Sequence, residues 1–539
     1  MSVVVETTQG QVGVGCNPLI FRGIPFAKPP IGDLRFKPPE PVDPWDGELD
    51  CSRFQPACAQ NPDPLDYMWG EVLAPGSEDC LYLNVWTPSL KGPGRPVLVW
   101  IHGGAFIIGS GRWQSYEGSR LVQRGQIVLV TINYRLGIFG FYHSSRSEYA
   151  RTANLGLLDQ IAALKWVRDN ITAFGGDPNN VTICGESAGA ISVSCLLACP
   201  EAKGLFHRAI CMSGAPSLVR SVDFAERVSS AFLRTANLGG GQDLLNCPTE
   251  HLLQAQETLL EGADFLGEMM FGPVVDGDVL PEPPLSAIEK GKAEDVALLT
   301  GTTLDEVRLW SLYNPILPWI PPRALNSWLR QLGLDPHVVR QMYREVRPSL
   351  NWGQRTMAIL GDALFWLPQI RLAEAQARHR DDTRMYLVTW QSPVRNGSLG
   401  AFHAVDESLL FGNLDAPGQQ YMVGTGSERE CLSYAIQDAW IAFVRDGDPN
   451  NPLLPEWPAF QPEDRATMLL DCPNRVEHDP NRNLRELWEG LPFDSLRPTV
   501  EELPRIAHIR WFFIQWALVI ILGLSLLSAV AVMIIWWLS

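Results

Sequence analysis

Ser187 stands in the pentapeptide Gly185-Glu186-Ser187-Ala188-Gly189, with a glycine two residues before it and another two residues after it. A β-branched run ends at Gly185, and a helix-compatible run of small and apolar residues begins at Ala188. This order predicts a strand, a tight turn and a helix, and the turn requires both glycines because side chains at those positions would collide. Such a turn lifts the hydroxyl out of the sheet, beside a helix N-terminus whose N–H groups can meet a developing negative charge. The pattern predicts a nucleophilic serine.

A serine hydroxyl is a poor nucleophile until a histidine takes its proton and a carboxylate orients that histidine. With the serine at such a turn, the acid and then the histidine follow along the chain. The histidines between Ser187 and the C-terminal segment stand at 207, 251, 337, 379, 403 and 478. His403 is the candidate base because it lies in a glycine-containing loop just past a strand-like run. Asp305 and Glu306 end another strand-to-loop segment, and spacing alone does not choose between them.

Backbone donors for an oxyanion are predicted at the segment His102-Gly103-Gly104-Ala105-Phe106, which directly follows an apolar run. Its small residues would let the main chain approach a substrate closely. The segment matches the HGGG type of loop, with alanine at the third small position.

The elements that must position these residues are predicted to alternate between strands and helices. Near-continuous apolar runs are typical of strands covered on both faces, and they occur at 81–86, 96–101, 127–132, 181–185, 209–214 and 385–390. A helical pattern at 156–167 falls between two of them, which indicates βαβ units and a largely parallel sheet. Beyond residue 214 the pattern is mainly helical, with loops expected near 241–250 and 311–322 as parts of cap insertions.

The composition is that of a globular protein with a large core, since 46% of the 539 residues are hydrophobic and 19% are charged. The formal net charge of −17 disfavours nucleic acid as a partner, and no cluster of basic residues offsets it. The eleven cysteines include no CxxC pair, and no histidine or second cysteine stands at metal-ligand spacing. Neither a metal site nor a cofactor is therefore expected.

The two ends of the chain differ in character. Residues 1–10 have neither the basic start nor the apolar run of a secretory signal. Residues 511–538 contain no charged side chain and carry tryptophans near both ends, and the part between Trp516 and Trp536 would form a helix about 30 Å long. This predicts a single transmembrane helix, a tail anchor, joined by a linker at 491–510 to a catalytic domain at 1–490. Because Arg505, His508 and Arg510 precede the span, the domain is expected in the cytoplasm.

Several longer motifs carry a family resemblance. They are Phe21–Ala27, Ser77–Val85, His102–Phe106, Asn133–Gly137, Asn154–Gln160, the pentapeptide around Ser187, and Phe271–Gly277. From about residue 3 to about 471, the chain resembles the type B carboxylesterase/cholinesterase family, and most closely the bacterial carboxylesterases of the para-nitrobenzyl esterase kind. The resemblance implies an α/β-hydrolase fold: a mostly parallel central sheet flanked by helices, with helical cap insertions.

The resemblance also implies roles for individual residues. The triad would be Ser187 as nucleophile, His403 as general base and then acid, and Glu306 rather than Asp305 as the orienting acid. Arg35 with Glu78 and Arg135 with Asp159 match ion pairs that stabilise the fold.

The oxyanion hole implied by the resemblance consists of the N–H groups of Gly104, Ala105 and Ala188. Ser213 matches a serine that, in relatives, lies in the layer of residues around the triad and supports the acid.

Cys58 and Cys80 could form the disulfide that secreted cholinesterases have around the loop before the Ser77–Val85 motif. The other cysteine pairs of that family have no clear counterparts here, which is consistent with a reducing compartment.

Together these features predict a serine carboxylesterase that hydrolyses small-molecule carboxylic esters through an acyl-enzyme intermediate, without metal or cofactor. A catalytically silent, cholinesterase-like adhesion or scaffold module is one alternative, and lipase or amidase activity on membrane-derived substrates is another. The sequence indicates no particular oligomeric state.

Overall fold

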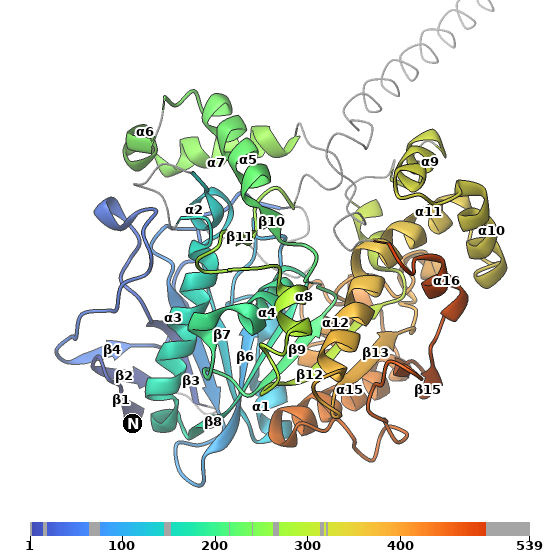
Figure 1. Ribbon diagram of the computed structural model, residues 1–539. Coiled ribbons are helices and arrows are strands. Elements are labelled where there is room, and N and C mark those ends of the chain that lie inside the picture. Colours follow the sequence, from blue (N-terminus) through green and yellow to red (C-terminus); the bar gives the residue numbers. More distant parts are fainter. Residues whose placement is uncertain are drawn as a thin grey trace, which may run out of the picture.

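A ten-stranded sheet runs through the molecule and organises the remaining elements, as Figure 1 shows for the computed structural model. The structure describes residues 3–14, 19–63, 76–144, 152–214, 216–239, 241–261, 269–312, 317–319 and 322–491. In spatial order the strands are β15 (Arg475–His478), β14 (Ala466–Leu470), β13 (Arg384–Val388), β12 (Ala297–Thr303), β9 (Arg208–Met212), β8 (Gly176–Glu186), β6 (Arg95–Ile101), β7 (Val128–Ile132), β5 (Tyr82–Thr87) and β3 (Leu19–Pro25).

The central part of this sheet is parallel, as predicted. All pairings from β14 through β13, β12, β9, β8 and β6 to β7 are parallel. Antiparallel pairs occur only at the two sides, where β15 joins β14 and where β5 joins β7 and β3. A separate three-stranded sheet holds β1 (Val3–Glu6), β2 (Gln11–Val14) and β4 (Glu48–Asp50), and a two-stranded one holds β10 (Arg220–Ser221) and β11 (Val274–Val275).

Each face of the large sheet carries its own hydrophobic core, because successive side chains of a strand point to opposite faces. In β6, Val97, Val99 and Ile101 belong to one core. Leu98 and Trp100 belong to the other. This explains why the strands read as continuous apolar runs rather than as alternating ones.

The helices divide between these two faces. One face is covered by α3 (Leu155–Asn170), α4 (Ala188–Ala198), α8 (Pro284–Glu289) and α12 (Leu367–Ala377). The other face is covered by α1 (Ser119–Gly125), α13 (Val405–Phe411) and α15 (Ser427–Asp446).

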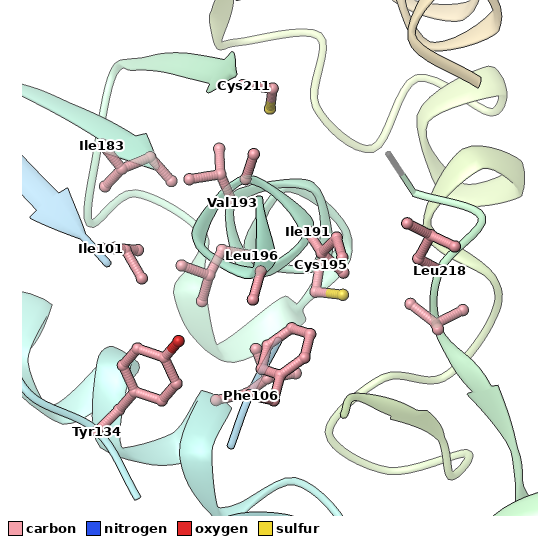
Figure 2. Close-up of a cluster of buried hydrophobic side chains, with 14 of the residues drawn as sticks. Ile101, Phe106, Tyr134, Ile183, Ile191, Val193, Cys195, Leu196, Cys211 and Leu218 are labelled. Carbon is pink, nitrogen blue, oxygen red and sulfur yellow. The ribbon is translucent and has the colours of Figure 1, made fainter. Parts of the chain in front are cut away.

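Helix α4, which begins directly after Ser187, is buried along its whole length. Figure 2 shows its side chains directed away from the helix axis in several directions, Val193 toward the side of Ile183 and Cys195 toward that of Leu218. A helix that is apolar all round must be enclosed by other elements. Its N-terminus is therefore held in a fixed position relative to the sheet.

Two further groups of helices lie at one end of the sheet, the upper end in Figure 1. They correspond to the predicted cap insertions and comprise α5 (Val222–Thr235), α6 (Gly241–Asn246), α7 (Thr249–Glu261), α9 (Pro322–Gln331), α10 (Pro336–Val346) and α11 (Trp352–Gly361). The remaining short helices are α2 (Gly137–Phe141), α14 (Gln420–Val423) and α16 (Arg482–Leu487). The prediction of a loop near 241–250 is wrong, because α6 and the start of α7 lie in this segment.

The predicted ion pairs are present and buried. Arg135 and Asp159 form a two-pronged pair with N–O distances of 2.6 and 2.8 Å. Arg35 pairs with Glu78 in the same manner and also donates to the carbonyl oxygens of Leu244 and Cys247.

Among the residues that the structure describes, no helix combines the length and the apolar character that crossing a membrane requires. The predicted span at 511–538 and all but the first residue of the predicted linker at 491–510 lie outside the described residues.

Candidate active site

Ser187 lies at the turn between β8 and α4 in a strained backbone conformation, with φ 54° and ψ −121°. A positive φ is unfavourable for a residue with a side chain and persists only where the surroundings enforce it. Here the Ser187 N–H donates to the carbonyl of Met212 at 2.9 Å, and its carbonyl accepts from Ile191 at 2.9 Å. The serine side chain is half-buried.

The two glycines of the pentapeptide are required by close backbone packing. A Cβ on Gly185 would overlap the main chain of Gly189, and a Cβ on Gly189 would overlap the carbonyl of Ile101. The turn can therefore close only with glycine at both positions, which gives the sequence pattern its physical reason.

His403 and Glu306 meet although 97 residues separate them in the chain, with His403 Nδ1 and Glu306 Oε2 2.5 Å apart. Because a carboxylate only accepts hydrogen bonds, the proton lies on Nδ1 and Nε2 is left free to act as a base. The other carboxylate oxygen of Glu306 accepts from the Thr303 N–H at 2.8 Å. Both side chains are buried.

Asp305, the alternative acid, has a different position. It pairs with Arg308 at 2.9 Å and accepts from the Ala401 N–H at 3.1 Å, while its own N–H donates to the Ala401 carbonyl. Asp305 thus ties the loop before His403 to the end of β12. The geometry favours Glu306 as the partner of the imidazole.

The Nε2 side of the imidazole faces the end of β8. His403 Nε2 lies 3.1 Å from Glu186 Oε1, and Glu186 is the last residue of β8, immediately before Ser187. The alignment of these two atoms does not make a hydrogen bond, so Nε2 is a buried nitrogen without a hydrogen-bond partner among the described residues. In the described part of the chain the Ser187 hydroxyl makes no hydrogen bond either, a looseness that is common before substrate binds.

Glu186 and Asp406 bring further carboxyl groups close to the imidazole. Burial, followed by the nearby Glu407, Asp406 and Glu306, raises the pKa of Glu186 well above its usual range. Burial also raises the pKa of Asp406 to about 6, although the Tyr386 hydroxyl donates to it at 2.8 Å. Burial therefore disfavours the charged form of both carboxyls in this site.

Aromatic rings pack against the imidazole. The ring centroid of Trp310 lies 4.8 Å from that of His403, and the centroid of Phe365 lies 5.1 Å from it. Phe365 belongs to a π-helical turn, Asp362–Trp366, between α11 and α12. Such turns insert an extra residue into a helix and redirect its side chains.

The loop after β6 has three consecutive residues with positive φ: 103° at Gly104, 52° at Ala105 and 63° at Phe106. Successive N–H groups in such a backbone can form a concave site for an anion. Within the described residues, the N–H groups of Gly104, Ala105 and Ala188 donate no hydrogen bond. Ala188 is moreover the first residue of α4, where the helix dipole favours negative charge.

Ser213 is fully buried, but its hydroxyl has no hydrogen-bond partner in the part of the chain that the structure describes. The second carboxylate oxygen of Glu306 accepts a hydrogen bond from the Thr303 N–H and not from Ser213. The supporting role that the resemblance implies for Ser213 stays a prediction.

Cys58 and Cys80 are adjacent, buried and unbonded, with sulfur atoms 2.7 Å apart. Cys58 also lies 2.8 Å from the Tyr134 carbonyl oxygen. Burial raises the pKa of Cys80 well above its usual range. The disulfide between them stays a prediction. No cluster of three or more metal-ligating side chains occurs among the described residues.

Sequence reasoning missed Glu186, Asp406, Trp310 and Phe365. Two of these had a signal that could have been used, since Glu186 lies inside the serine motif and Asp406 stands three residues after His403. Trp310 and Phe365 carry no comparable signal, because only the fold brings them to the imidazole.

Comparison with known proteins gives a consistent picture. The model of the carboxylesterase family matches residues 4–488. Para-nitrobenzyl esterase from Bacillus subtilis is 41% identical over 469 residues, which cover 86% of this chain and 94% of that protein. Phenmedipham hydrolase from Pseudarthrobacter oxydans is 34% identical over 480 residues, covering 87% and 94%. The crystal structure of the Geobacillus stearothermophilus carboxylesterase EST55 at pH 6.2 superposes with a TM-score of 0.82 at 41% identity, covering 90% of this chain and all of that one.

Proposed function

The chain belongs to the carboxylesterase family, and from this premise we propose that Ser187, Glu306 and His403 form its catalytic triad. The protein is a carboxylic ester hydrolase of the serine type with an α/β-hydrolase fold. The observation that carries the proposal is the 2.5 Å contact between His403 Nδ1 and Glu306, which directs Nε2 to the end of the strand that Ser187 follows.

In the proposed cycle, Ser187 Oγ attacks the ester carbonyl while His403 Nε2 takes the hydroxyl proton. Glu306 holds the Nδ1 proton and stabilises the imidazolium. His403 then returns the proton to the leaving alcohol, and an acyl group remains on Ser187. A water molecule repeats the attack with the same proton transfers and releases the acid.

We assign the oxyanion hole to the N–H groups of Gly104, Ala105 and Ala188. The positive φ values of the loop and the start of α4 support this assignment. Preorganised donors of this kind contribute about 3–4 kcal/mol each to lowering the barrier.

Replacement of Ser187 by alanine tests the mechanism. Hydrolysis of a short-chain nitrophenyl ester should fall to background, because no other group takes over the attack. Ser194→Ala is a matched control, since Ser194 is a buried serine of α4 whose hydroxyl lies 3.7 Å from the Cys211 sulfur, and it should retain activity. Full activity of Ser187→Ala would exclude the triad.

Covalent labelling by an organophosphate tests the same proposal without a substrate. A phosphoryl group should be found on the peptide that contains Ser187. A silent adhesion module would stay unlabelled.

We further propose that residues 511–538 span a membrane, that residues 491–510 link this span to a catalytic domain at 1–490, and that the domain lies in the cytoplasm. The uncharged stretch with tryptophans near both ends and the basic residues before it support this arrangement. In sealed vesicles with the cytoplasmic face outward, added protease should digest the domain. Protection of the domain would reverse the orientation, and release from the membrane by alkaline carbonate would exclude the span.

A tethered esterase would meet amphiphilic esters at the membrane surface, so lipase-like activity is a second candidate. A profile of nitrophenyl esters from acetyl to palmitoyl, with detergent micelles for the long chains, measures it. Absence of long-chain activity would leave small soluble esters as the substrates.

A further inference from the structure

Cys431 and Cys472 are the exposed cysteines among the ten in the part of the chain that the structure describes; the other eight are buried. Cys431 belongs to α15, and Cys472 lies in the connection between β14 and β15. The fold brings these two distant segments together at the surface.

One contact between the segments is at a carbonyl group of α15. The Cys472 sulfur lies 3.5 Å from the Glu428 carbonyl oxygen in the first turn of α15. Cys431 stands three residues after Glu428, and a helical side chain leans toward the N-terminus over the preceding turn. Side chains three or four residues after a helical carbonyl can reach its oxygen. The Cys472 sulfur therefore lies beside the turn of α15 that carries Cys431.

Both segments are held in place by other contacts. Near the start of α15, Arg429 is buried and donates to the Leu414 carbonyl at 3.0 Å and to Asp415 at 2.8 Å. In the β14–β15 connection, Asp471 accepts from the Thr389 hydroxyl at 2.7 Å, and its N–H donates to the Asn474 side chain at 3.1 Å. Neighbouring residues therefore hold both cysteine-bearing segments in place.

We propose that Cys431 and Cys472 form a reversible disulfide that fastens α15 to the β14–β15 connection when low-molecular-weight disulfides are present. One protein thiolate attacks a sulfur of glutathione disulfide, forms a mixed disulfide and expels one glutathione thiolate. The second protein thiolate attacks the protein sulfur of that mixed disulfide, forms the S–S bond and expels the second glutathione. Two protein thiols lose their protons and are oxidised, and one glutathione disulfide is reduced to two thiols.

The surroundings of Cys472 set the pH dependence of this reaction. Partial burial of the sulfur, then the charges of Glu428 and Asp471, and last the neighbouring Cys431 raise the pKa of Cys472 above its usual value. Because the thiolate is the reacting species, cross-linking should become faster as the pH rises from 7 to 9.

A disulfide here would stabilise the fold without reaching the reacting atoms. α15 packs against α13, which begins two residues after His403, and the Ser433 hydroxyl donates to the Leu409 carbonyl at 2.6 Å. A cross-link that closes a loop of about 40 residues should raise the apparent melting temperature by roughly 2–4 °C in a domain of this size. Esterase activity should stay unchanged.

Peptide mapping of the full chain after incubation with glutathione disulfide tests the proposal. Trypsin releases Cys431 in peptide 430–445 and Cys472 in peptide 466–475, each with a single cysteine. Under non-reducing conditions these two should be joined and should separate on reduction. Cys58 and Cys80 share peptide 54–91, so a bond between them does not create this cross-link. The C431S and C472S variants should each abolish both the cross-link and the rise in melting temperature.

Two results would overturn the proposal. One is glutathione attached to each cysteine with no link between the two peptides. The other is a link that joins two copies of the chain, which concentration-dependent dimer formation on a non-reducing gel would reveal.

Discussion

Replacing Glu306 by glutamine should remove activity while leaving the fold intact. Glutamine has the size of glutamate, and its side-chain oxygen can still accept from the Thr303 N–H. Its amide group then faces His403 Nδ1 as a donor, where the carboxylate accepted at 2.5 Å. The imidazole must then carry its proton on Nε2, and that nitrogen can no longer accept the proton of the Ser187 hydroxyl.

The size of this effect follows from what is lost. Without the correct tautomer and without a negative charge beside the imidazolium, kcat should fall by about 10³–10⁴-fold, or about 4–5.5 kcal/mol. The KM should change little, because Glu306 is buried behind the histidine.

Asp305→Asn is the matched control because it removes the neighbouring carboxylate. The new amide oxygen would still accept from the Ala401 N–H, but the buried Arg308 would lose its charged partner at 2.9 Å. Breaking a buried pair in this way costs about 3–5 kcal/mol of stability. The two variants should therefore differ in kind: Glu306→Gln should be stable and inactive, and Asp305→Asn unstable but active per folded molecule.

Initial rates with a nitrophenyl ester, divided by the folded fraction from a size-exclusion peak, and urea unfolding curves measure both quantities. If the folded Asp305→Asn enzyme loses a thousandfold in kcat while Glu306→Gln keeps its rate, the assignment of the acid is wrong.

Three further predictions each concern the replacement of a single residue. Gly189→Ala should yield no soluble enzyme or lose at least about 100-fold in activity, since its Cβ would overlap the Ile101 carbonyl. Gly204→Ala meets no neighbouring atom but must keep a φ of 79°, so it should lose only about 1–2 kcal/mol of stability and be recovered active; expression and rate assays decide. The pKa of Asp406 is raised to about 6 by burial, so its contribution to stability is complete below pH 3.8 and is lost as the pH rises to 6. Asp406→Asn should therefore gain about 3 kcal/mol over the parent at pH 7 and less at pH 5, and equal urea midpoints at pH 7 would contradict this. Glu186→Gln should keep kcat within about tenfold at pH 7, because burial already favours the uncharged form, and a loss above 100-fold would mean that its charge is needed.

The sheet was predictable because its strands are buried on both faces. Runs such as 96–101 and 127–132 contain little but apolar residues, and β6 and β7 occupy them within a residue. The caps were less predictable, since their helices are short and the glycines near 241 indicated a loop where α6 forms. Tertiary packing overrides local propensity most easily in such short segments.

In the candidate site, too, some residues can be predicted from the local sequence, and others are brought together only by the fold. Ser187 was predictable because a tight turn demands two glycines at fixed spacing. The choice between Asp305 and Glu306 had no local signal, since adjacent residues of a loop point in different directions that only the fold determines. The aromatic neighbours of His403 come from a 3₁₀ turn and a π-helical turn, and neither irregularity has a sequence pattern that residue types alone would reveal.

The crowding of carboxyl groups around one imidazole raises the question of which of them holds the charge that catalysis needs. Glu306 accepts from both the imidazole and the Thr303 N–H, and hydrogen bonds to a carboxylate stabilise its charged form. Glu186 Oε1 has no hydrogen-bond partner within the described ranges, so ionisation there would place an uncompensated charge in the core. An ionised Glu186 at 3.1 Å would also hold a proton on Nε2 and compete with Ser187 for that nitrogen. In the proposed mechanism, burial of Glu186 therefore disfavours a negative charge on the Nε2 side of the imidazole and leaves that side open to the serine.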